Sequence, residues 1–177
     1  HKIDSSNEYT TLLEITESFY TNSIFAMAAH PTNNIIYITR QHMLSSYYNG
    51  SHYEYTTAQS PAILEFSINE QGILELASLK DFLNATELWG IIPGYSYSRV
   101  DFYCAHTIGN YLYVSFSYSN TYAISRWSLL DSEDRQLYVN DTISNEVRDL
   151  TSNRNNPEML YALEIELPFT KVYKINV

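Results

Sequence analysis

A pattern that recurs three times constrains the fold of this chain more than any other feature of its sequence. In each copy a short apolar run meets a polar turn, and a second run follows in which tyrosine stands between apolar residues. These second runs centre on Tyr37, Tyr113 and Tyr161, and His30 and His106 precede the first two tyrosines by seven residues. Alternating runs joined by a short polar turn predict a β-hairpin. We therefore expect the same pair of strands three times, with the two histidines at one shared repeat position.

Further strands are expected after each hairpin. Apolar alternation around Phe66, Trp127 and Ile175 predicts a third strand in each repeat. Residues 73–78 and 136–139 have the same alternation and predict a fourth strand in the first two repeats. The sequence thus predicts an all-β chain.

Repeats of four short antiparallel strands, about 40–50 residues apart, are typical of β-propeller blades. The expected blade units are residues 23–78, 99–140 and 147–177, with residues 11–16 as a strand of a preceding blade and residues 80–89 as a short helix. About three blades leave strand edges that a stable protein covers, so we expect them to be part of a larger ring. The remaining blades would come from the same polypeptide or from another chain. The alternative fold is an antiparallel β-sandwich, which also has short alternating strands.

Two stretches carry a family resemblance. Residues 27–39, MAAHPTNNIIYIT, and residues 62–78, AILEFSINEQGILELAS, resemble blades of the lactonase-type seven-bladed propellers. This group includes bacterial 6-phosphogluconolactonase-like proteins and fungal carboxymuconate cyclases, and the similarity extends over about three blades, from Ser23 to Val177. The resemblance implies a propeller fold and makes a lactonase or cyclase activity one expectation.

Charge and composition narrow the classes of partner. The net charge is −10, which disfavours nucleic acid because a nucleic-acid site needs a basic patch. No apolar run approaches the ~18–20 residues of a membrane-spanning helix, and Cys104 is the one cysteine, which excludes an internal disulfide and a cysteine-rich zinc site. We expect no cofactor and no metal, and we interpret His30 and His106 as structural residues.

The cellular location is suggested by composition. A surface rich in Tyr, Ser, Thr and Asn and poor in Lys favours a secreted glycoprotein, with a cytoplasmic protein as the alternative. Three sequons place possible N-linked glycans at Asn49, Asn84 and Asn140.

A long polar insertion separates the second and third strands of the first repeat. Residues 41–60 form this segment, which we interpret as a surface loop rich in aromatic and uncharged polar residues. Tyrosine offers a flat ring and a hydroxyl, which suits a sugar or another small polar ligand. The candidate binding residues are His42, Tyr47, Tyr48, His52, Tyr53 and Glu54.

Charged residues at the start of the second and third repeats are the candidates for catalysis. Asp101 and Asp149 take equivalent places in the repeat spacing, each with an arginine nearby, Arg99 and Arg148. An acid or base beside a cation is what a lactonase needs to activate water and hold a carboxylate. The other interpretation is that they form structural ion pairs between neighbouring repeats.

These patterns lead to two expectations about function. The first is a binding or interaction module that presents an acidic, Tyr-rich face to a protein or glycan partner. The alternative is a lactonase- or cyclase-like enzyme that acts on a small carboxylated lactone or sugar lactone. The second requires Arg99, Asp101 and Arg148 to converge, whereas the first requires only an exposed face.

Overall fold

Every regular element of the described chain is a β-strand, as the sequence predicted. The computed structural model describes residues 2–3, 9–10, 24–40, 43–59, 61–81, 100–118, 121–131, 134–138, 143–153, 155–166 and 168–177. Within these residues all strand pairs are antiparallel and no helix is present. Two short strands precede the main sheets, β1 (Lys2–Ile3) and β2 (Tyr9–Thr10), and they pair with each other.

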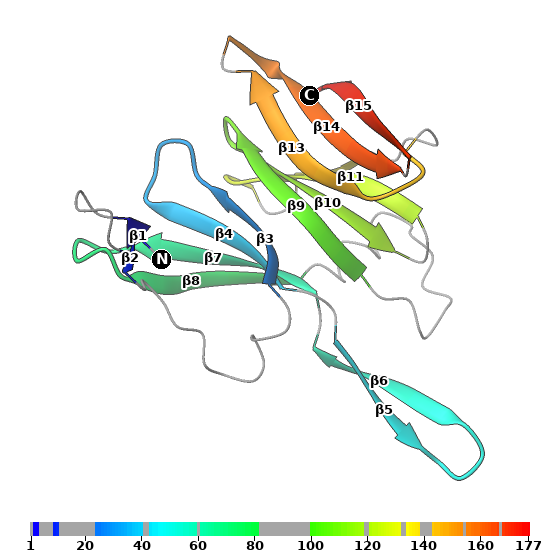
Figure 1. Ribbon diagram of the computed structural model, residues 1–177. Coiled ribbons are helices and arrows are strands. Elements are labelled where there is room, and N and C mark those ends of the chain that lie inside the picture. Colours follow the sequence, from blue (N-terminus) through cyan, green and yellow to red (C-terminus); the bar gives the residue numbers. More distant parts are fainter. Residues whose placement is uncertain are drawn as a thin grey trace.

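Three larger sheets follow one another in chain order (Figure 1). The first sheet has the order β3-β4-β7-β8, the second β9-β10-β11-β12 and the third β13-β14-β15, and a separate hairpin β5-β6 is inserted between β4 and β7. Tyr37, Tyr113 and Tyr161 lie on the second strands of their sheets, where the sequence placed them. The strand bounds are β3 (Ile24–Ala29), β4 (Ile35–Arg40), β5 (Met43–Tyr48), β6 (Tyr53–Gln59), β7 (Ala62–Ile68), β8 (Leu74–Asp81), β9 (Val100–Ile108), β10 (Tyr111–Tyr118), β11 (Thr121–Ser128), β12 (Arg135–Tyr138), β13 (Val147–Asn153), β14 (Asn156–Glu166) and β15 (Phe169–Asn176).

The first strand of each sheet contains a β-bulge near its start. In β9 the pairing steps from Phe102 to Cys104 while its partner β10 advances by one residue, so Tyr103 is the extra residue. In β13 the step from Val147 to Asp149 makes Arg148 the extra residue, and β3 has a similar irregularity between Ile24 and Met27. A bulge changes which face the following side chains point to.

The bulge at Tyr103 lets β9 contribute to two different hydrophobic clusters. Before it, Val100 and Phe102 pack in the cluster shared with the first sheet; after it, Cys104 and Ile108 pack in the cluster shared with the third sheet. In an unbroken strand all four would share one face, because successive side chains alternate.

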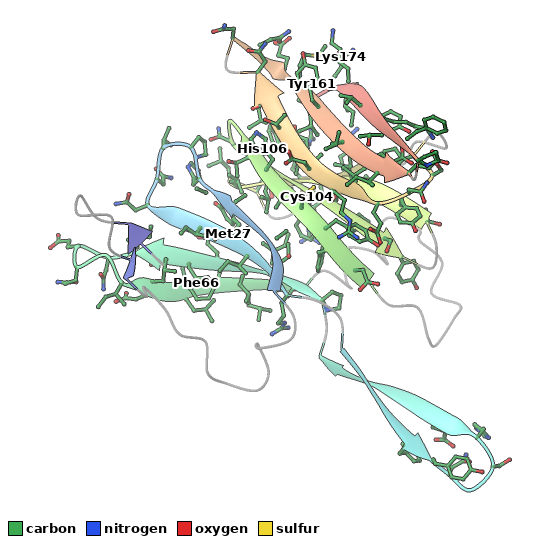
Figure 2. All side chains as sticks on the ribbon, viewed as in Figure 1. Met27, Phe66, Cys104, His106, Tyr161 and Lys174 are labelled. Carbon is green, nitrogen blue, oxygen red and sulfur yellow. The ribbon has the colours of Figure 1, made fainter. Side chains whose placement is uncertain are left out.

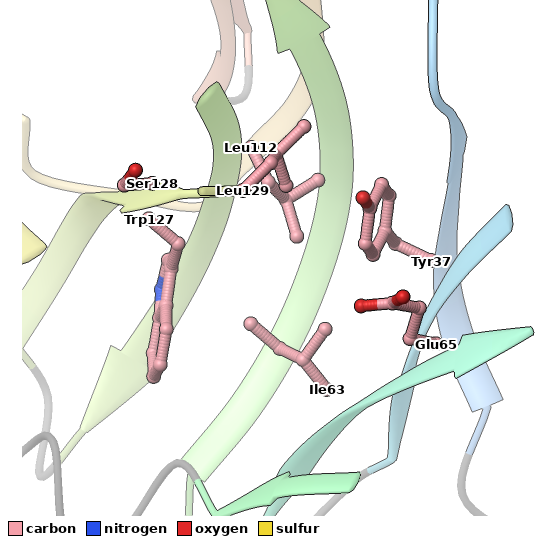
Figure 3. A pocket seen from close by; sticks show the side chains of 7 residues that line it. All are labelled: Tyr37, Ile63, Glu65, Leu112, Trp127, Ser128 and Leu129. Carbon is pink, nitrogen blue, oxygen red and sulfur yellow. The ribbon is translucent and has the colours of Figure 1, made fainter. Parts of the chain in front are cut away.

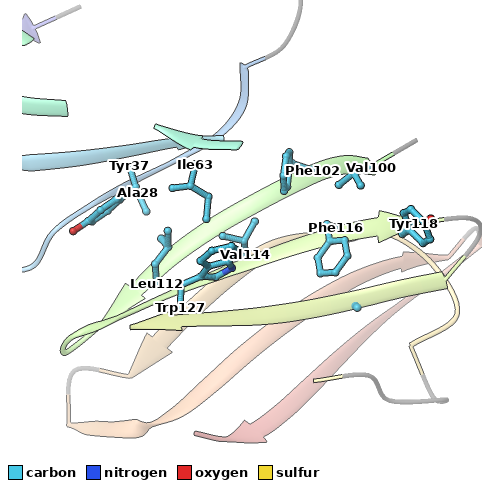
Figure 4. Close-up of a cluster of buried hydrophobic side chains, with 11 residues drawn as sticks. Ala28, Tyr37, Ile63, Val100, Phe102, Leu112, Val114, Phe116, Tyr118 and Trp127 are labelled. Atoms are coloured by element: carbon cyan, nitrogen blue, oxygen red, sulfur yellow. The ribbon is translucent and has the colours of Figure 1, made fainter. Parts of the chain in front are cut away.

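The second sheet is packed on both of its faces. One face meets the first sheet in a cluster drawn in Figure 4, which consists of Ala28, Tyr37, Ile63, Val100, Phe102, Leu112, Val114, Phe116, Tyr118, Ala123 and Trp127. The other face meets the third sheet through Ile108, Tyr113, Ile124, Ile143, Val147, Leu150, Leu160 and Ala162. The first strands are the closest neighbours between sheets, with β9 beside both β3 and β13.

A small cavity of about 10 Å³ remains between the first and second sheets (Figure 3). Tyr37 and Glu65 border it from the first sheet, and Leu112 and Trp127 border it from the second. Burial, with a smaller contribution from the Glu65 charge, raises the pKa of Tyr37 to about 12. The Tyr37 hydroxyl therefore stays neutral at ordinary pH.

The first hairpins of the three sheets have turns of different length, so the equal spacing of seven residues in the sequence does not correspond to equal positions in the sheets. His106 lies inside β9 and pairs with Tyr113, but Tyr37 pairs with Ala28 and Tyr161 pairs with Thr151. The constant spacing of seven residues is thus not a constant register, because the three turns differ in length. The second hairpin has a two-residue turn in which Gly109 has a φ of 55°, a conformation that glycine adopts without strain.

The fourth strands and the expected short helix have different outcomes. The fourth strands form as β8 and β12. Lys80 and Asp81, the start of the helix expected over residues 80–89, belong to β8, and residues 82–89 lie outside the described residues, as do residues 11–16.

Candidate functional site

The insertion at residues 41–60 is a β-hairpin and not the surface loop that we expected. β5 and β6 pair from Met43 with Gln59 to Tyr48 with Tyr53, and the hairpin extends away from the three sheets (Figure 1). The turn explains why this segment forms strands. The Asn49 side-chain oxygen accepts hydrogen bonds from the backbone N–H groups of Ser51 and His52, both at 3.0 Å, and Gly50 supplies the positive φ of 95°.

Four side chains at the hairpin tip form one hydrogen-bonded group, which we call the tip network: Tyr47, Asn49, His52 and Glu54. The Tyr47 hydroxyl and the Asn49 side-chain amide both donate to the Glu54 carboxylate. His52 Nε2 lies 3.3 Å from Asn49 Nδ2 and 3.9 Å from Glu54 Oε1. The hydrogen bond from Tyr47, and then that from Asn49, lowers the pKa of Glu54, while the bond to Glu54 raises the pKa of Tyr47. The tip thus presents a carboxylate and the neutral hydroxyl of Tyr47.

Two of the predicted binding residues expose large parts of their rings at the hairpin tip. Tyr47 is 53% exposed and Tyr48 is 59% exposed. They are neighbours on β5, so their side chains point to opposite faces of the hairpin. Tyr53 pairs with Tyr48 through the backbone, and His42 lies outside the described residues. Two exposed rings beside polar groups are suited to stacking against a flat apolar patch of a ligand and bonding its hydroxyls.

Three of the four predicted catalytic residues, Asp101, Arg148 and Asp149, lie near the two bulges, together with two residues that the sequence did not single out. Arg148 forms a salt bridge with Glu146, and its guanidinium carbon lies 5.2 Å from the centre of the Tyr103 ring. The Tyr103 hydroxyl is 2.8 Å from Ser117 Oγ. Burial raises the pKa of Tyr103, the hydrogen bond with Ser117 opposes this, and the charges of Glu146 and Asp101 add smaller increases.

The pairing of the strands shows that Asp101 and Asp149 do not occupy equivalent positions in the second and third sheets, contrary to the prediction from their spacing. Asp149 pairs with Leu163, and the corresponding pair in the second sheet is Cys104 with Ser115. The acid that corresponds to Asp101 is Glu146, just before β13, whose carbonyl accepts the N–H of Ile165 at 3.2 Å. No sequence pattern pointed to Glu146 or Tyr103, because their placement depends on the bulges. Arg99 lies outside the described residues.

The salt bridge of Arg148 joins it to a residue two positions away in the chain, so it is not the ion pair between neighbouring repeats that the sequence interpretation proposed. Arg148 is held by Glu146 and by the Tyr103 ring, and Asp149 is exposed. A cation that is already paired with a carboxylate is a weak anchor for a substrate carboxylate.

Cys104 and Ser115 form a buried polar link between the second and third sheets. Ser115 Oγ donates to the carbonyl of Val147 at 2.7 Å, and Cys104 Sγ lies 3.0 Å from Ser115 Oγ and 3.3 Å from the same carbonyl. His106 Nε2, 2.9 Å from Ser152 Oγ, adds a second link. Burial raises the pKa of the Cys104 thiol to about 11 and lowers the pKa of His106. Both groups are therefore neutral structural links.

The buried thiol predicts low reactivity. At pH 8, iodoacetamide should alkylate Cys104 in the folded chain about 100-fold more slowly than in the unfolded chain, because raising the pKa from 9.0 to about 11 lowers the thiolate fraction by that factor. The rate is measured by mass spectrometry with and without urea, and Cys104 is the one cysteine that reacts. Equal rates would show that the thiol is not buried as described.

The two histidines serve different structural roles. His30 lies in the turn after β3, where its Nδ1 accepts the N–H groups of Thr32 at 3.2 Å and Asn33 at 3.1 Å. It therefore caps the first hairpin, whereas His106 links two sheets. Within the described part of the chain, no group of three His, Cys, Asp or Glu side chains is placed to hold a metal ion. The same residues include no helix of the length and apolarity that a membrane span requires.

An open pocket of about 340 Å³ lies between the second and third sheets, at the end where the β9–β10 turn stands. It was not foreseen from the sequence, since its walls come from two repeats. Arg126 occupies one wall, 2.9 Å from Asp134 and 4.4 Å above the Tyr111 ring. The lining residues are Ile108, Gly109, Asn110, Tyr111, Tyr113, Arg126, Ser128, Leu130, Glu158 and Val177.

Of the three predicted glycosylation sites, Asn49 is the one whose structure is described. Asn49 is exposed in the hairpin turn, and Asn84 and Asn140 lie outside the described residues. A glycan would be attached to the side-chain amide nitrogen of Asn49, and in this structure that nitrogen donates a hydrogen bond to Glu54. A glycan on Asn49 would replace one of the two hydrogens on this nitrogen and leave the other to donate to Glu54.

Comparison with known proteins identifies no relative of this chain. The chain matches no protein-family model, and searches of curated proteins and of solved structures give no match. The resemblance to lactonase-type propellers thus depends on the residues quoted above.

Proposed function

We propose that this chain is a binding module, part of a β-propeller, and that it presents a Tyr-rich, acidic surface to a glycan or protein partner. The observation that carries the proposal is the hairpin β5-β6, which extends away from the sheets and has Tyr47 and Tyr48 exposed at its tip (Figure 1). Exposed aromatic residues at the end of a rigid strand pair are typical of recognition surfaces.

The packing of the sheets supports the propeller part of the proposal. The second sheet has both faces buried, one against each neighbour, whereas a two-layer sandwich buries one face of each sheet. The sheets follow each other in chain order, and their first strands are the closest neighbours. A radial stack of antiparallel sheets has these properties. The remaining blades would come from the same polypeptide or from another chain.

The alternative of a lactonase- or cyclase-like enzyme has less support. It needs Arg148 to hold a substrate, but Arg148 forms a salt bridge with Glu146. The hairpin tip instead offers an exposed ring, since Tyr48 is more than half exposed. The composition that favours a secreted protein also agrees with a glycan-binding role.

Replacing Tyr48 by alanine tests the proposed surface. We expect about tenfold weaker binding to immobilised oligosaccharides, since losing about 1.4 kcal/mol of ring contact changes an affinity tenfold. Binding is measured on a panel of oligosaccharides by biolayer interferometry. Tyr48→Phe is the matched control: it keeps the ring and removes the hydroxyl, so it should retain most of the affinity if stacking dominates. Oligosaccharide binding that is unchanged in Tyr48→Ala would overturn the proposed surface.

A further inference from the structure

The open pocket between the second and third sheets is separate from the hairpin tip and from the bulges. These two sheets pack against each other, with His106 and Cys104 on the side of the second sheet that faces the third (Figure 2). The pocket lies at the end of this interface where the β9–β10 turn stands, and its volume is about 340 Å³. A pocket of this size is large enough for a small organic molecule.

The equivalent place between the first and second sheets is closed. Strand pairing relates the two places, since Glu65 pairs with Tyr37 as Arg126 pairs with Tyr113. Tyr37 and Glu65 border the closed cavity of about 10 Å³ (Figure 3). Tyr113 and Arg126 line the open pocket. The two spaces are therefore equivalent positions of successive interfaces, and the second has room for a ligand.

The side chains of the following sheet decide whether this place is closed. In the closed interface the second sheet fills it with Trp127 and Leu129 (Figure 3). The third sheet has Ile175 and Val177 at the equivalent positions, as its strand pairing and the hydrogen bond of the Val177 N–H show. Both are smaller than the residues at the earlier positions. The pocket is thus open because the third sheet lacks the indole ring that closes the preceding interface.

The chemistry of the pocket walls suits an aromatic ring. Tyr111 and Tyr113 supply aromatic surface, and the guanidinium carbon of Arg126 lies 4.4 Å from the centre of the Tyr111 ring. A guanidinium is planar and stacks on aromatic rings, and the charge of Arg126 is balanced by Asp134 at 2.9 Å. Glu158 in the lining and the net charge of −10 disfavour an anion.

Hydrogen bonds fix the wall at the end of β11 without any ligand. Ser128 Oγ accepts the backbone N–H groups of Leu130 at 3.2 Å and Asp131 at 3.1 Å. The N–H of Leu129 donates to the carbonyl of Asn110 at 2.8 Å, which ties this wall to the β9–β10 turn. A wall that is ordered before binding lowers the entropic cost of taking up a ligand.

We propose that this pocket binds a neutral aromatic molecule of about the size of an indole ring. The ring takes the place that Trp127 fills in the preceding interface and contacts the guanidinium of Arg126. Its removal from water between the two sheets provides the apolar part of the affinity. The inference is independent of binding at the hairpin tip, because the β5-β6 hairpin extends away from the sheets that form the pocket (Figure 1).

Titration of 5-fluoroindole with the intact chain, followed by fluorine NMR, tests the pocket. Saturable binding is expected with a dissociation constant of about 1 mM or tighter, as for a ligand of about ten heavy atoms. Val177→Trp puts an indole ring into the pocket and should weaken binding about tenfold or more, because the volume is then occupied. Ile165→Trp is the matched control, since it adds the same ring on the third sheet at a position that is 45% exposed and outside the pocket lining.

Arg126→Lys is a second variant, and its outcome does not depend on the folding of Val177→Trp. It keeps the positive charge beside Asp134 and removes the planar group, so 5-fluoroindole should bind about fivefold more weakly. Absence of saturable binding to wild type overturns the inference, as does unchanged binding in either pocket variant. Tyr48→Ala should bind 5-fluoroindole like wild type, so failure at the hairpin tip and failure at the pocket are distinguishable.

Competition with unlabelled molecules tests the class of ligand. Indole should displace 5-fluoroindole. Cyclohexanol should displace it less well, because it has no aromatic face for the guanidinium, and indoleacetate should also displace it less well, because Glu158 and the net charge repel its carboxylate. Displacement by cyclohexanol as effective as that by indole would overturn the aromatic assignment, and the same result with indoleacetate would overturn the neutral one.

Discussion

Replacing Phe116 by alanine should destabilise the chain by about 3–5 kcal/mol, the usual cost of removing a buried phenylalanine ring. Phe116 is 1% exposed and lies in the cluster between the first and second sheets (Figure 4). Its removal leaves a cavity between two sheets whose positions are fixed by their other contacts, so the space cannot close without moving both. The loss is measured as the change in the free energy of unfolding in urea.

Phe169 provides the matched control, because the same substitution there removes a ring that is 70% exposed. Phe169→Ala should change the free energy of unfolding by less than about 1 kcal/mol. A similar loss for both variants would mean that the cluster between the sheets does not hold the fold together.

Glu164→Ala should cost about 1–3 kcal/mol, although the wild-type residue is a charged group in the interior. Glu164 is fully buried, and its carboxylate accepts hydrogen bonds from the backbone N–H of Ser144 at 3.1 Å, from Ser144 Oγ at 3.0 Å and from the Tyr173 hydroxyl. Alanine would leave these donors without the carboxylate acceptor. Ser144 is exposed and Tyr173 is half-buried, so water can satisfy part of them, and the loss stays within the roughly 1–3 kcal/mol that is typical of one unsatisfied group. Glu166→Ala, which removes a surface salt bridge to Lys171, should cost less than about 1 kcal/mol.

The stabilisation from Glu164 should disappear in acid. Burial alone would raise the pKa of Glu164, but the hydrogen bonds from Tyr173 and Ser144, with a smaller contribution from Lys171, outweigh it and lower the pKa below the usual 4.5. A group whose folded pKa is lowered stabilises the fold above its unfolded pKa and loses that effect as the pH falls through the folded pKa. The difference between wild type and Glu164→Ala, from urea unfolding at several pH values, should therefore shrink below pH 4.5. A difference that is constant or grows on acidification would contradict the assigned network.

Local pattern was enough to locate most strands. The alternation of apolar residues around Tyr113 and Trp127 placed β10 and β11, because one face of a strand must be apolar to pack. The tip residues Tyr47, Tyr48, His52 and Glu54 were identified as a possible site from composition alone. The interpretation of this segment as a loop passed over a hairpin signal in the sequence, Asn49-Gly50 between two runs that are rich in Tyr, Ser and Thr.

The tertiary structure decided how the strands pair and which face of a sheet each side chain points to. The bulges at Tyr103 and Arg148 move the following side chains to the other face, and turns of unequal length separate His30 from the place that His106 holds. A one-residue shift changes every contact of a strand while the alternation of apolar and polar residues stays almost the same. The Arg148–Glu146 pair and the burial of Glu164 follow from such shifts. The sequence by itself therefore determined an all-β chain of repeated hairpins, and only the packed sheets decided which side chains are buried and which, like Val172 and Tyr48, are exposed.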